Sequence, residues 1–326
     1  MQSRGASRVN RRSLPLFGIC IVGALLLTPT CMAERSSKLS HQHTKKNAAR
    51  VTEVTSHASD HTSFRGWDYL AHRLRQNGVD EGDIIALYAD ARMPRFTYIP
   101  FSVYPKEPAS IYSTFNKPRF EEMGATFIRE NKSSFDAVER TLRVPPEVVT
   151  AILVIESQIG KNTGHEMIAY RLSRLASANA PENLTHNYKL QRKKYPKVTF
   201  DQIKRRGRYL EHTFLPEIPA LIAIAKQNHV DPLTIKGSSA GAFGLPQFLP
   251  SAFIRYSRDG DKDGVVSLHN PQDALWSTAN YLASFGFRST IPLQEKRSII
   301  WRYNKSKAYI DAVLRLSQGI KSRLSD

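Results

Sequence analysis

Residues 144–157 read VPPEVVTAILVIES, an apolar run that opens with two prolines and closes with a carboxylate. Proline suits the first helical turn because its missing N–H loses no hydrogen bond there, and the glutamate that follows suits the positive end of the helix dipole. Val149, Ile152 and Leu153 lie seven, four and three residues before Glu156, so this carboxylate shares a helix face with apolar side chains. The stretch predicts a buried helix that ends in an acid.

A carboxyl group on such a face would be partly desolvated, which suits a general acid that works near neutral pH. The alternative is that the helix ends at the surface and Glu156 is merely solvated; the helix alone leaves both readings open.

A second stretch, residues 236–248, reads KGSSAGAFGLPQF. Glycines allow a ligand to approach the backbone closely, and Gln247 can hydrogen-bond a sugar hydroxyl or acetamido group, although taken alone the segment is compatible with an ordinary loop.

Most of the remaining chain shows the spacing of amphipathic helices, whereas strand-like alternation is scarce. Residues 93–118 are rich in proline and aromatic side chains and predict an ordered wrap over the surface. We therefore expect a mainly α protein. The segments with helical periodicity are 67–74, 84–87, 120–142, 145–159, 214–227, 271–285 and 298–317.

The N-terminus has the pattern of a secretory signal peptide, residues 1–33: four arginines, an apolar run over 14–27 and a small-residue cleavage site at Ala33. The apolar run is shorter than the ~20 residues needed to span a bilayer, which favours cleavage over a membrane anchor. Cys31 lacks the small residues expected before a lipidated cysteine, so peripheral or lipid-anchored membrane association is not favoured. The predicted location is the periplasm.

The cysteine count and the net charge exclude two classes of protein. The chain has 47 Lys and Arg against 29 Asp and Glu, a net charge of +18, and its two cysteines both lie in the signal peptide. A disulfide scaffold and a cysteine-based zinc site are therefore excluded for the mature chain, which keeps a net charge of +14. Residues 34–62 are polar and predict a flexible tether, since their histidines lack the regular spacing of a metal tract.

Half of that mature excess lies in residues 182–208, with nine Lys and Arg against two acids. A charge run is usually a solvated helix face. Nucleic acid is a rival partner for such a cluster, but an exported chain seldom meets it, so no nucleic-acid partner is expected.

Together these motifs resemble lytic murein transglycosylases, in particular the membrane-bound lytic transglycosylase B family. That family has Glu-Ser or Glu-Thr at the end of an apolar helix, then a Gly-x-x-Gly-x-x-Gln motif and a later Ala-Asn-Tyr. In this sequence the three motifs stand as Glu156-Ser157, residues 241–247 and residues 279–281. Further matches are residues 144–147, 205–206, 236–238 and 302–304.

The resemblance implies a mainly α, lysozyme-like transglycosylase fold with an EF-hand-like metal loop and a helical N-terminal extension. The catalytic domain would cover residues 63–318, with a helical and wrap part at 63–143, a lysozyme-like core at 144–318 and a C-terminal tail at 319–326.

The resemblance also implies an activity without an organic cofactor: cleavage of the β-1,4 bond between N-acetylmuramic acid and N-acetylglucosamine in peptidoglycan. Glu156 would act as general acid and then as base, and the C6 hydroxyl would close on C1 to give a 1,6-anhydro end. A single carboxylate is enough for this chemistry, whereas ordinary glycosidases need two. The implied sugar-binding residues are Tyr112, Arg205, Arg206, Ser238, Gln247, Tyr281, Tyr303 and Asn304. Alternatively, Tyr281 is a core aromatic and Asn304 a solvent-facing polar residue.

Residues 259–265 read DGDKDGV, the start of an EF-hand loop, with acids at positions 1, 3 and 5 and glycine at 6. Asp259, Asp261 and Asp263 would bind Ca²⁺ through their side chains and Val265 through its carbonyl oxygen, in a structural role, with Na⁺ as an alternative ion. Position 12 is an asparagine, and the resemblance implies a longer loop that Asp273 closes. As a first-turn helix acid, Asp273 has a purely structural explanation as well.

Two other functions remain compatible with the sequence: a muramidase that hydrolyses the same bond with water, and a non-catalytic, calcium-dependent wall-binding protein.

Overall fold

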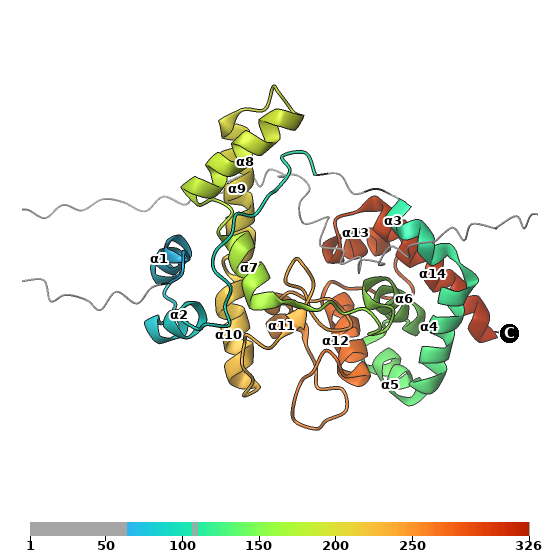
Figure 1. Ribbon diagram of the computed structural model, residues 1–326. Coiled ribbons are helices and arrows are strands. Elements are labelled where there is room, and N and C mark those ends of the chain that lie inside the picture. Colours follow the sequence, from blue (N-terminus) through green and yellow to red (C-terminus); the bar gives the residue numbers. More distant parts are fainter. Residues whose placement is uncertain (1–63, 106–107, 109, 326) are drawn as a thin grey trace, which may run out of the picture.

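The computed structural model describes residues 64–105, 108 and 110–325; the predicted signal peptide and tether lie outside them. Helices dominate this part of the chain, as expected for the mainly α class, and the two short strands pair antiparallel (Figure 1). The elements are α1 (Asp68–Gln76), α2 (Glu81–Tyr88), α3 (Ser110–Ser113), the 3₁₀ turn η2 (Thr114–Asn116), α4 (Pro118–Glu130), α5 (Lys132–Leu142), α6 (Pro146–Ser157), β1 (Glu166–Met167), α7 (Ile168–Ala176), α8 (Pro181–Lys194), α9 (Phe200–Phe214), α10 (Glu217–Gln227), β2 (Lys236–Gly237), α11 (Pro250–Tyr256), α12 (Pro271–Ser284), α13 (Leu293–Tyr303) and α14 (Lys307–Ser325).

Helix α6 is the helix predicted from the opening stretch, and it packs against α4, α5, α12 and α14, a group named here the α6 bundle. Pro146 occupies its first turn, and every residue from Val148 to Ser157 is buried. Each fully buried Leu or Ile contributes about 1.5–3 kcal/mol of transfer free energy, so this helix is anchored along its whole length. It ends where Gln158 adopts a left-handed conformation with φ 52°.

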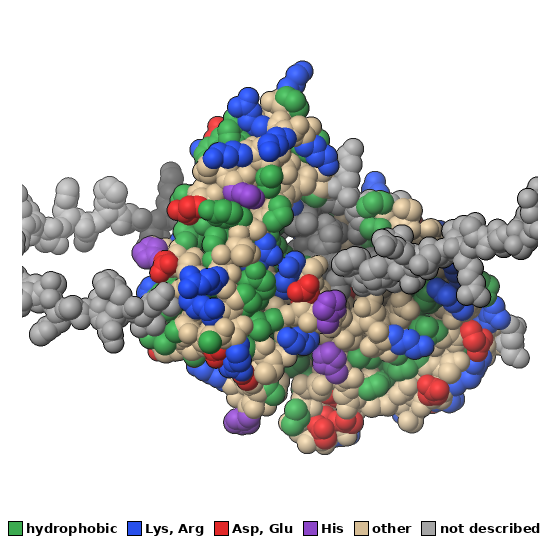
Figure 2. All heavy atoms as spheres, in the orientation of Figure 1, with side chains coloured by type: hydrophobic (Ala, Val, Ile, Leu, Met, Phe, Trp, Pro, Cys, Tyr) green, Lys and Arg blue, Asp and Glu red, His purple; other side chains and the backbone are tan. Residues whose placement is uncertain are grey.

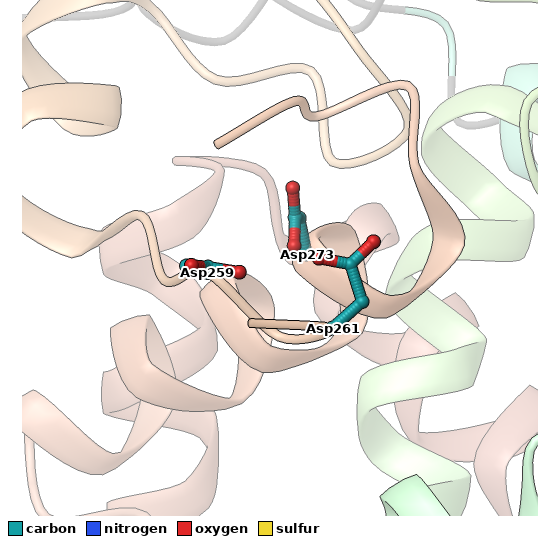
Figure 3. Close-up of side chains that lie close together, drawn as sticks. All are labelled: Asp259, Asp261 and Asp273. Atoms are coloured by element: carbon teal, nitrogen blue, oxygen red, sulfur yellow. The ribbon is translucent and has the colours of Figure 1, made fainter. Parts of the chain in front are cut away.

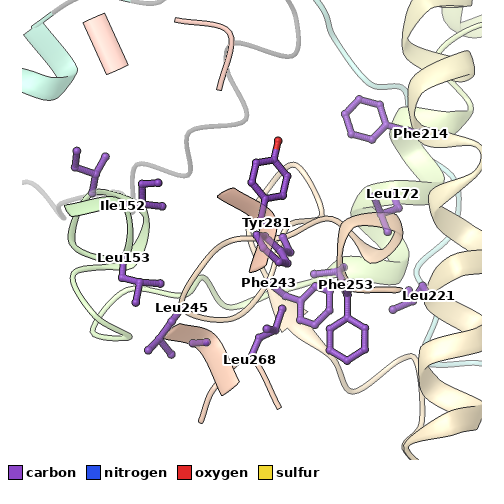
Figure 4. Packing of buried hydrophobic residues seen from close by; sticks show 14 of the residues in the cluster. Ile152, Leu153, Leu172, Phe214, Leu221, Phe243, Leu245, Phe253, Leu268 and Tyr281 are labelled. Carbon is purple, nitrogen blue, oxygen red and sulfur yellow. The ribbon is translucent and has the colours of Figure 1, made fainter. Parts of the chain in front are cut away.

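A second group of helices, α7 to α10, forms the α9 column, in which α9 contacts α7, α8 and α10. The column stands to the left of α6 in Figure 1, with α1 and α2 on its other side. Helix α11 packs on both α10 and α12 and so connects the column to the α6 bundle. Figure 4 shows Leu172 and Leu221 of the column at one end of a continuous core and Ile152 and Leu153 of α6 at the other.

Of the proline- and aromatic-rich segment, residues 93–105 form an ordered wrap, as predicted, and side-chain amides hold it in place. Residues 110–116 of the same segment form α3 and η2, and residues 106, 107 and 109 lie outside the described residues. The backbone N–H groups of Ile99 and Phe101 donate to the amide oxygens of Asn183 and Asn187 on α8, each at 2.8 Å. Asn187 Nδ2 donates back to the carbonyl of Ile99 at 2.9 Å. These buried amides take the place of a neighbouring strand, so the extended backbone keeps its hydrogen bonds without a sheet.

The structure adds detail in three segments that the sequence pattern did not indicate. The expected tail at 319–326 continues helix α14 as far as Ser325, because its apolar spacing extends to Ile320, which is fully buried against Gly124 of α4. The periodic segment 120–142 contains two helices, separated at Asn131. The segment 298–317 likewise divides after Tyr303.

No helix within residues 64–105 and 110–325 has both the length and the apolar character needed to cross a membrane.

Candidate active site

Glu156 lies at the C-terminal end of α6 and is 5% exposed, so of the two readings that the helix left open the buried carboxyl is correct and the solvated one is wrong. The hydroxyl of Tyr309, on α14, donates to Glu156 Oε1 at 2.8 Å. Burial raises the pKa of Tyr309 well above its usual value, and the nearby Glu156 carboxylate raises it further. The phenol therefore stays protonated and acts as a fixed donor that orients the acid.

Ser157 ties the end of the same helix to the glycine-rich segment. Its hydroxyl donates to the carbonyl of Leu245 at 2.8 Å and accepts from the backbone N–H of Gly160 at 2.9 Å. The Glu-Ser pair thus has two roles, since the first residue is the candidate acid and the second fixes the loop next to it.

Aromatic rings from four helices, α3, α12, α13 and α14, gather beside the acid. Tyr303, at the end of α13, stacks on Tyr309 with ring centroids 6.4 Å apart, and Tyr281 of α12 meets Tyr303 edge-on at 4.9 Å. Tyr112 of α3 meets Tyr309 at 5.6 Å. Burial raises the pKa of Tyr303 well above its usual value, and the Glu156 carboxylate adds to this. These contacts bring three of the predicted sugar-binding tyrosines to one place.

Asn304 follows Tyr303 at the break between α13 and α14 and is 5% exposed. Its Nδ2 lies 3.5 Å from the hydroxyl of Tyr112. The alternative of a solvent-facing polar residue is wrong for Asn304, because the chain turns inward at this break.

The glycine-rich loop is closed by its own polar groups. Gln247, with φ 53°, donates its side-chain amide to the carbonyls of Thr163 at 3.0 Å and Gly244 at 2.8 Å. Ser238 accepts from the backbone N–H of Ala242 at 3.0 Å. Both predicted residues are buried and shape the loop that faces the end of α6, where Leu245 packs near Leu153 (Figure 4).

Arg205 and Arg206 lie elsewhere, on α9 of the column. Arg205 is exposed, whereas the half-buried Arg206 places its guanidinium over the ring of Tyr209, 5.2 Å from the centroid. Burial lowers the pKa of Arg206. Lysines and arginines crowd the α8–α9 end of the molecule in Figure 2. Arg205 and Arg206 lie on α9 of the column, whereas the tyrosine cluster around Glu156 is carried by α3, α12, α13 and α14.

Three acids of the predicted calcium loop converge. Carboxylate oxygens of Asp259, Asp261 and Asp273 lie within 4.8 Å of one another. Figure 3 shows the three side chains together at the start of the loop and of α12. Asp263 is outside this group and accepts from the backbone N–H of Val265, whose side chain is exposed.

Asp273 anchors the acidic loop to helix α12. It is fully buried, and its two oxygens accept from the backbone N–H groups of Gly260 and Ser267, both at 2.7 Å. Burial raises its pKa, with smaller contributions from Asp261 and Asp259. Carboxylates in such a group repel one another unless a cation neutralises them, and oxygen donors are what Ca²⁺ prefers.

Tyr309 is the residue that sequence reasoning missed. It follows Tyr303 by six residues, a spacing that puts two side chains on different faces of one continuous helix. The break at residues 304–306 brings the two rings together, and the hydrophobic pattern does not indicate that break. Its nearest signal in the sequence is the Asn-Lys-Ser run between the two helical segments.

For the glycan cleavage that the resemblance implies, replacing Tyr309 with phenylalanine is expected to lower kcat about 10- to 150-fold with little change in KM, because a hydrogen bond to a charged group is worth about 1.5–3 kcal/mol. Steady-state turnover of a soluble glycan checks this. Tyr188→Phe, which alters a half-buried tyrosine of α8, is the matched control. An equal loss in both variants would contradict an orienting role for Tyr309.

A family model described as "Transglycosylase SLT domain" matches residues 63–297. The membrane-bound lytic murein transglycosylase B of Escherichia coli is 30% identical over 173 residues, which cover 53% of this chain and 40% of that protein. The matched region therefore spans less than half of the length of that curated relative.

Solved structures share the fold. The E. coli lytic transglycosylase SLT35, in complex with bulgecin A, has a TM-score of 0.60 at 20% identity and covers 80% of this chain and 94% of that one. The same protein in complex with calcium has a TM-score of 0.59, also at 20% identity, with the same coverage. SltB3 of Pseudomonas aeruginosa, in complex with NAG-NAM-pentapeptide, has a TM-score of 0.57 at 19% identity and covers 79% of this chain and 80% of that one. The predicted lysozyme-like transglycosylase fold is thereby confirmed.

Proposed function

The chain belongs to the transglycosylase SLT domain family, and from this membership we propose that it is a lytic transglycosylase acting on the glycan strands of peptidoglycan. The observation that carries the proposal is the buried carboxyl group of Glu156, held by Tyr309 and facing a loop tied to its own helix. Similarity to proteins named as lytic transglycosylases and solved with a peptidoglycan fragment supports the substrate class.

In the proposed reaction the protonated Glu156 gives its proton to the glycosidic oxygen as the bond between that oxygen and C1 of the muramic sugar breaks. The carboxylate then takes the proton of the C6 hydroxyl while O6 forms a bond to C1. Glu156 ends in its starting protonation state, and the product carries a 1,6-anhydro ring. One carboxyl group thus serves as acid and base, and water is not consumed.

The tyrosine cluster and the glycine-rich loop are the proposed sugar-binding surface. Tyr112, Tyr281, Tyr303 and Asn304 would contact the sugar rings from one side, and the loop with Ser238 and Gln247 from the other. Aromatic faces suit the apolar faces of sugars, while amide and hydroxyl groups match their polar edges. Arg205 and Arg206 would bind carboxylates of the peptide stem or of the muramyl group, outside this cluster.

Digestion of purified sacculi in H₂¹⁸O tests the reaction. A transglycosylase is expected to release muropeptides with 1,6-anhydro ends that contain no ¹⁸O, as read by mass spectrometry. A hydrolytic muramidase would instead leave reducing ends that carry ¹⁸O. Binding to sacculi without release of any muropeptide would identify a non-catalytic wall-binding protein.

We also propose that Asp259, Asp261 and Asp273 hold Ca²⁺, or Na⁺ in its absence. The fit rests on three converging oxygen donors, one of them fully buried, and a related structure was solved with calcium. A bound cation would neutralise the acidic group and hold the loop against α12, in a structural role.

Adding Ca²⁺ at about 100 times its Kd is expected to stabilise the protein by about 2.7 kcal/mol, which for a chain of this size raises Tm by several degrees. Differential scanning calorimetry with calcium and with chelator measures the shift. Asp259→Asn should abolish it, whereas Asp136→Asn, an acid of α5 paired with Lys132, should keep it. A shift that survives Asp259→Asn would place the ion elsewhere.

Export to the periplasm, with membrane association less favoured, remains the location we propose from residues 1–33.

A further inference from the structure

A groove lies on the column side of the molecule, where the start of α1, the wrap and the junction of α7 with α8 meet. Its larger part has a volume of about 510 Å³ and a neighbouring part about 450 Å³. Tyr98 and Glu182 line both parts, so the two form one groove along the beginning of α8. In Figure 1 the column stands between α1 and α6, which separates this groove from Glu156.

The ring of Tyr98 is an exposed aromatic wall that the protein holds in place. It is 46% exposed, yet it stacks on His186 with centroids 4.7 Å apart and an interplanar angle of 21°. Phe96 meets it edge-on at 5.9 Å, and Arg174 fixes the adjoining backbone by donating to the carbonyl of Tyr98 at 2.6 Å. A large, ordered aromatic surface open to solvent suits a ligand rather than a core.

The charge of the groove is opposite to that of the chain. Asp68 and Glu182 line the larger part, which has no lysine or arginine, although the chain carries a net charge of +18. Both carboxylates face solvent, and within residues 64–105 and 110–325 neither is paired with a lysine or arginine. Each stands in a first helical turn, where the helix dipole alone favours an acid. The additional feature is the cavity, which both acids line together with Tyr98.

We propose that this groove binds an amine-bearing peptide stem of peptidoglycan, an inference that rests on the proposed function. The free ammonium of the stem would lie between Asp68 and Glu182 and against the face of Tyr98, where carboxylates and a π-face both attract a cation. The chain of the stem would follow α8 toward Lys189, which lines the far part of the groove and can form an ion pair with a carboxylate of the stem.

A contact between the groove and the peptide stem, away from Glu156, would raise the effective concentration of the attached glycan strand at the tyrosine cluster. A strand held by its stem at the groove and by its sugars at the tyrosine cluster is bound at two points, so it dissociates more slowly than from either alone. The groove takes no part in the chemical step.

The test measures binding, so that it does not depend on turnover. Isothermal titration calorimetry of the catalytically silent Glu156→Gln protein would use a synthetic stem tetrapeptide with a free side-chain amine, and the same peptide acetylated on that amine. The free peptide is expected to bind about tenfold more tightly than the acetylated one. Adding Asp68→Asn and Glu182→Gln should remove the difference, and Tyr98→Ala should weaken binding of both peptides.

The matched control is Asp201→Asn with Glu295→Gln, which removes two exposed first-turn acids from α9 and α13. It should retain the preference for the free amine. Equal affinity for the two peptides, or the same loss in the control, would overturn the inference. Absence of anhydro ends in the sacculus digestion would refute the proposed function instead, since the peptide titration reads the groove alone.

Discussion

Glu156→Gln is expected to lower the rate of glycan cleavage by about a thousandfold, within the range that general acid–base catalysis contributes. Glutamine has nearly the shape of glutamate and can still accept the hydrogen bond of Tyr309, but it can neither give nor take a proton at the glycosidic bond. The release of anhydro-muropeptides from sacculi, followed by liquid chromatography, measures the loss.

A glutamate of the same helix provides the control. Glu147 stands in the first turn of α6, half-buried and remote from the tyrosine cluster, so Glu147→Gln removes a charge without touching the acid. It should retain nearly full activity. Comparable activity of Glu156→Gln and the wild-type protein, with both folded by circular dichroism, would assign the acid to another residue.

Gly244→Ala is expected to destabilise the protein by about 2–5 kcal/mol, the sum of a conformational cost and a packing cost. Gly244 has φ +72°, where a non-glycine residue costs about 1–2 kcal/mol, and an added Cβ would lie 2.3 Å from Cβ of the buried Leu268. Relieving that overlap costs typically another 1–3 kcal/mol. Urea unfolding monitored by tryptophan fluorescence measures the sum, and because the loop faces Glu156, activity should fall as well.

Gly286→Ala separates the two contributions. Gly286 has φ +85° just after α12, but an added Cβ meets nothing within 4 Å. Its replacement should therefore cost only the conformational part, about 1 kcal/mol. If both alanines destabilised the protein equally, close packing against Leu268 would not be the reason for glycine at position 244.

The sequence predicted those parts of the structure that depend on a single local pattern of residues. Helix α6 follows from its prolines and apolar run, and the face that Glu156 shares with Val149 and Ile152 offered its burial as one of two readings. The wrap was predicted from its composition, but its partners were not, because Asn183 and Asn187 belong to a segment whose charge suggested only a solvated surface. Tertiary pairing of this kind leaves no local signal.

Helix breaks limited the prediction of the site in the same way. Asn131 and Asn304 each end one helix and precede another, whereas the apolar spacing continues across both. A pattern with period 3.6 identifies a face but does not register a change of direction. The position of Tyr309 over Glu156 depends on the second of these breaks, so the orienting donor could be found only in three dimensions.

Two hydrogen bonds hold the glycine-rich loop. The hydroxyl of Ser157 donates to the carbonyl of Leu245, and the hydroxyl of Tyr303 donates to the carbonyl of the next residue, Pro246, at 2.6 Å. Two successive peptide groups of the glycine-rich loop are thereby fastened to two different helices. The loop is rigid before a strand arrives, so the loss of conformational entropy on binding falls on the glycan, whose torsions must adapt to a fixed surface. Among the glycans that the proposed function admits, those whose torsions already match this surface would bind at the lowest entropic cost.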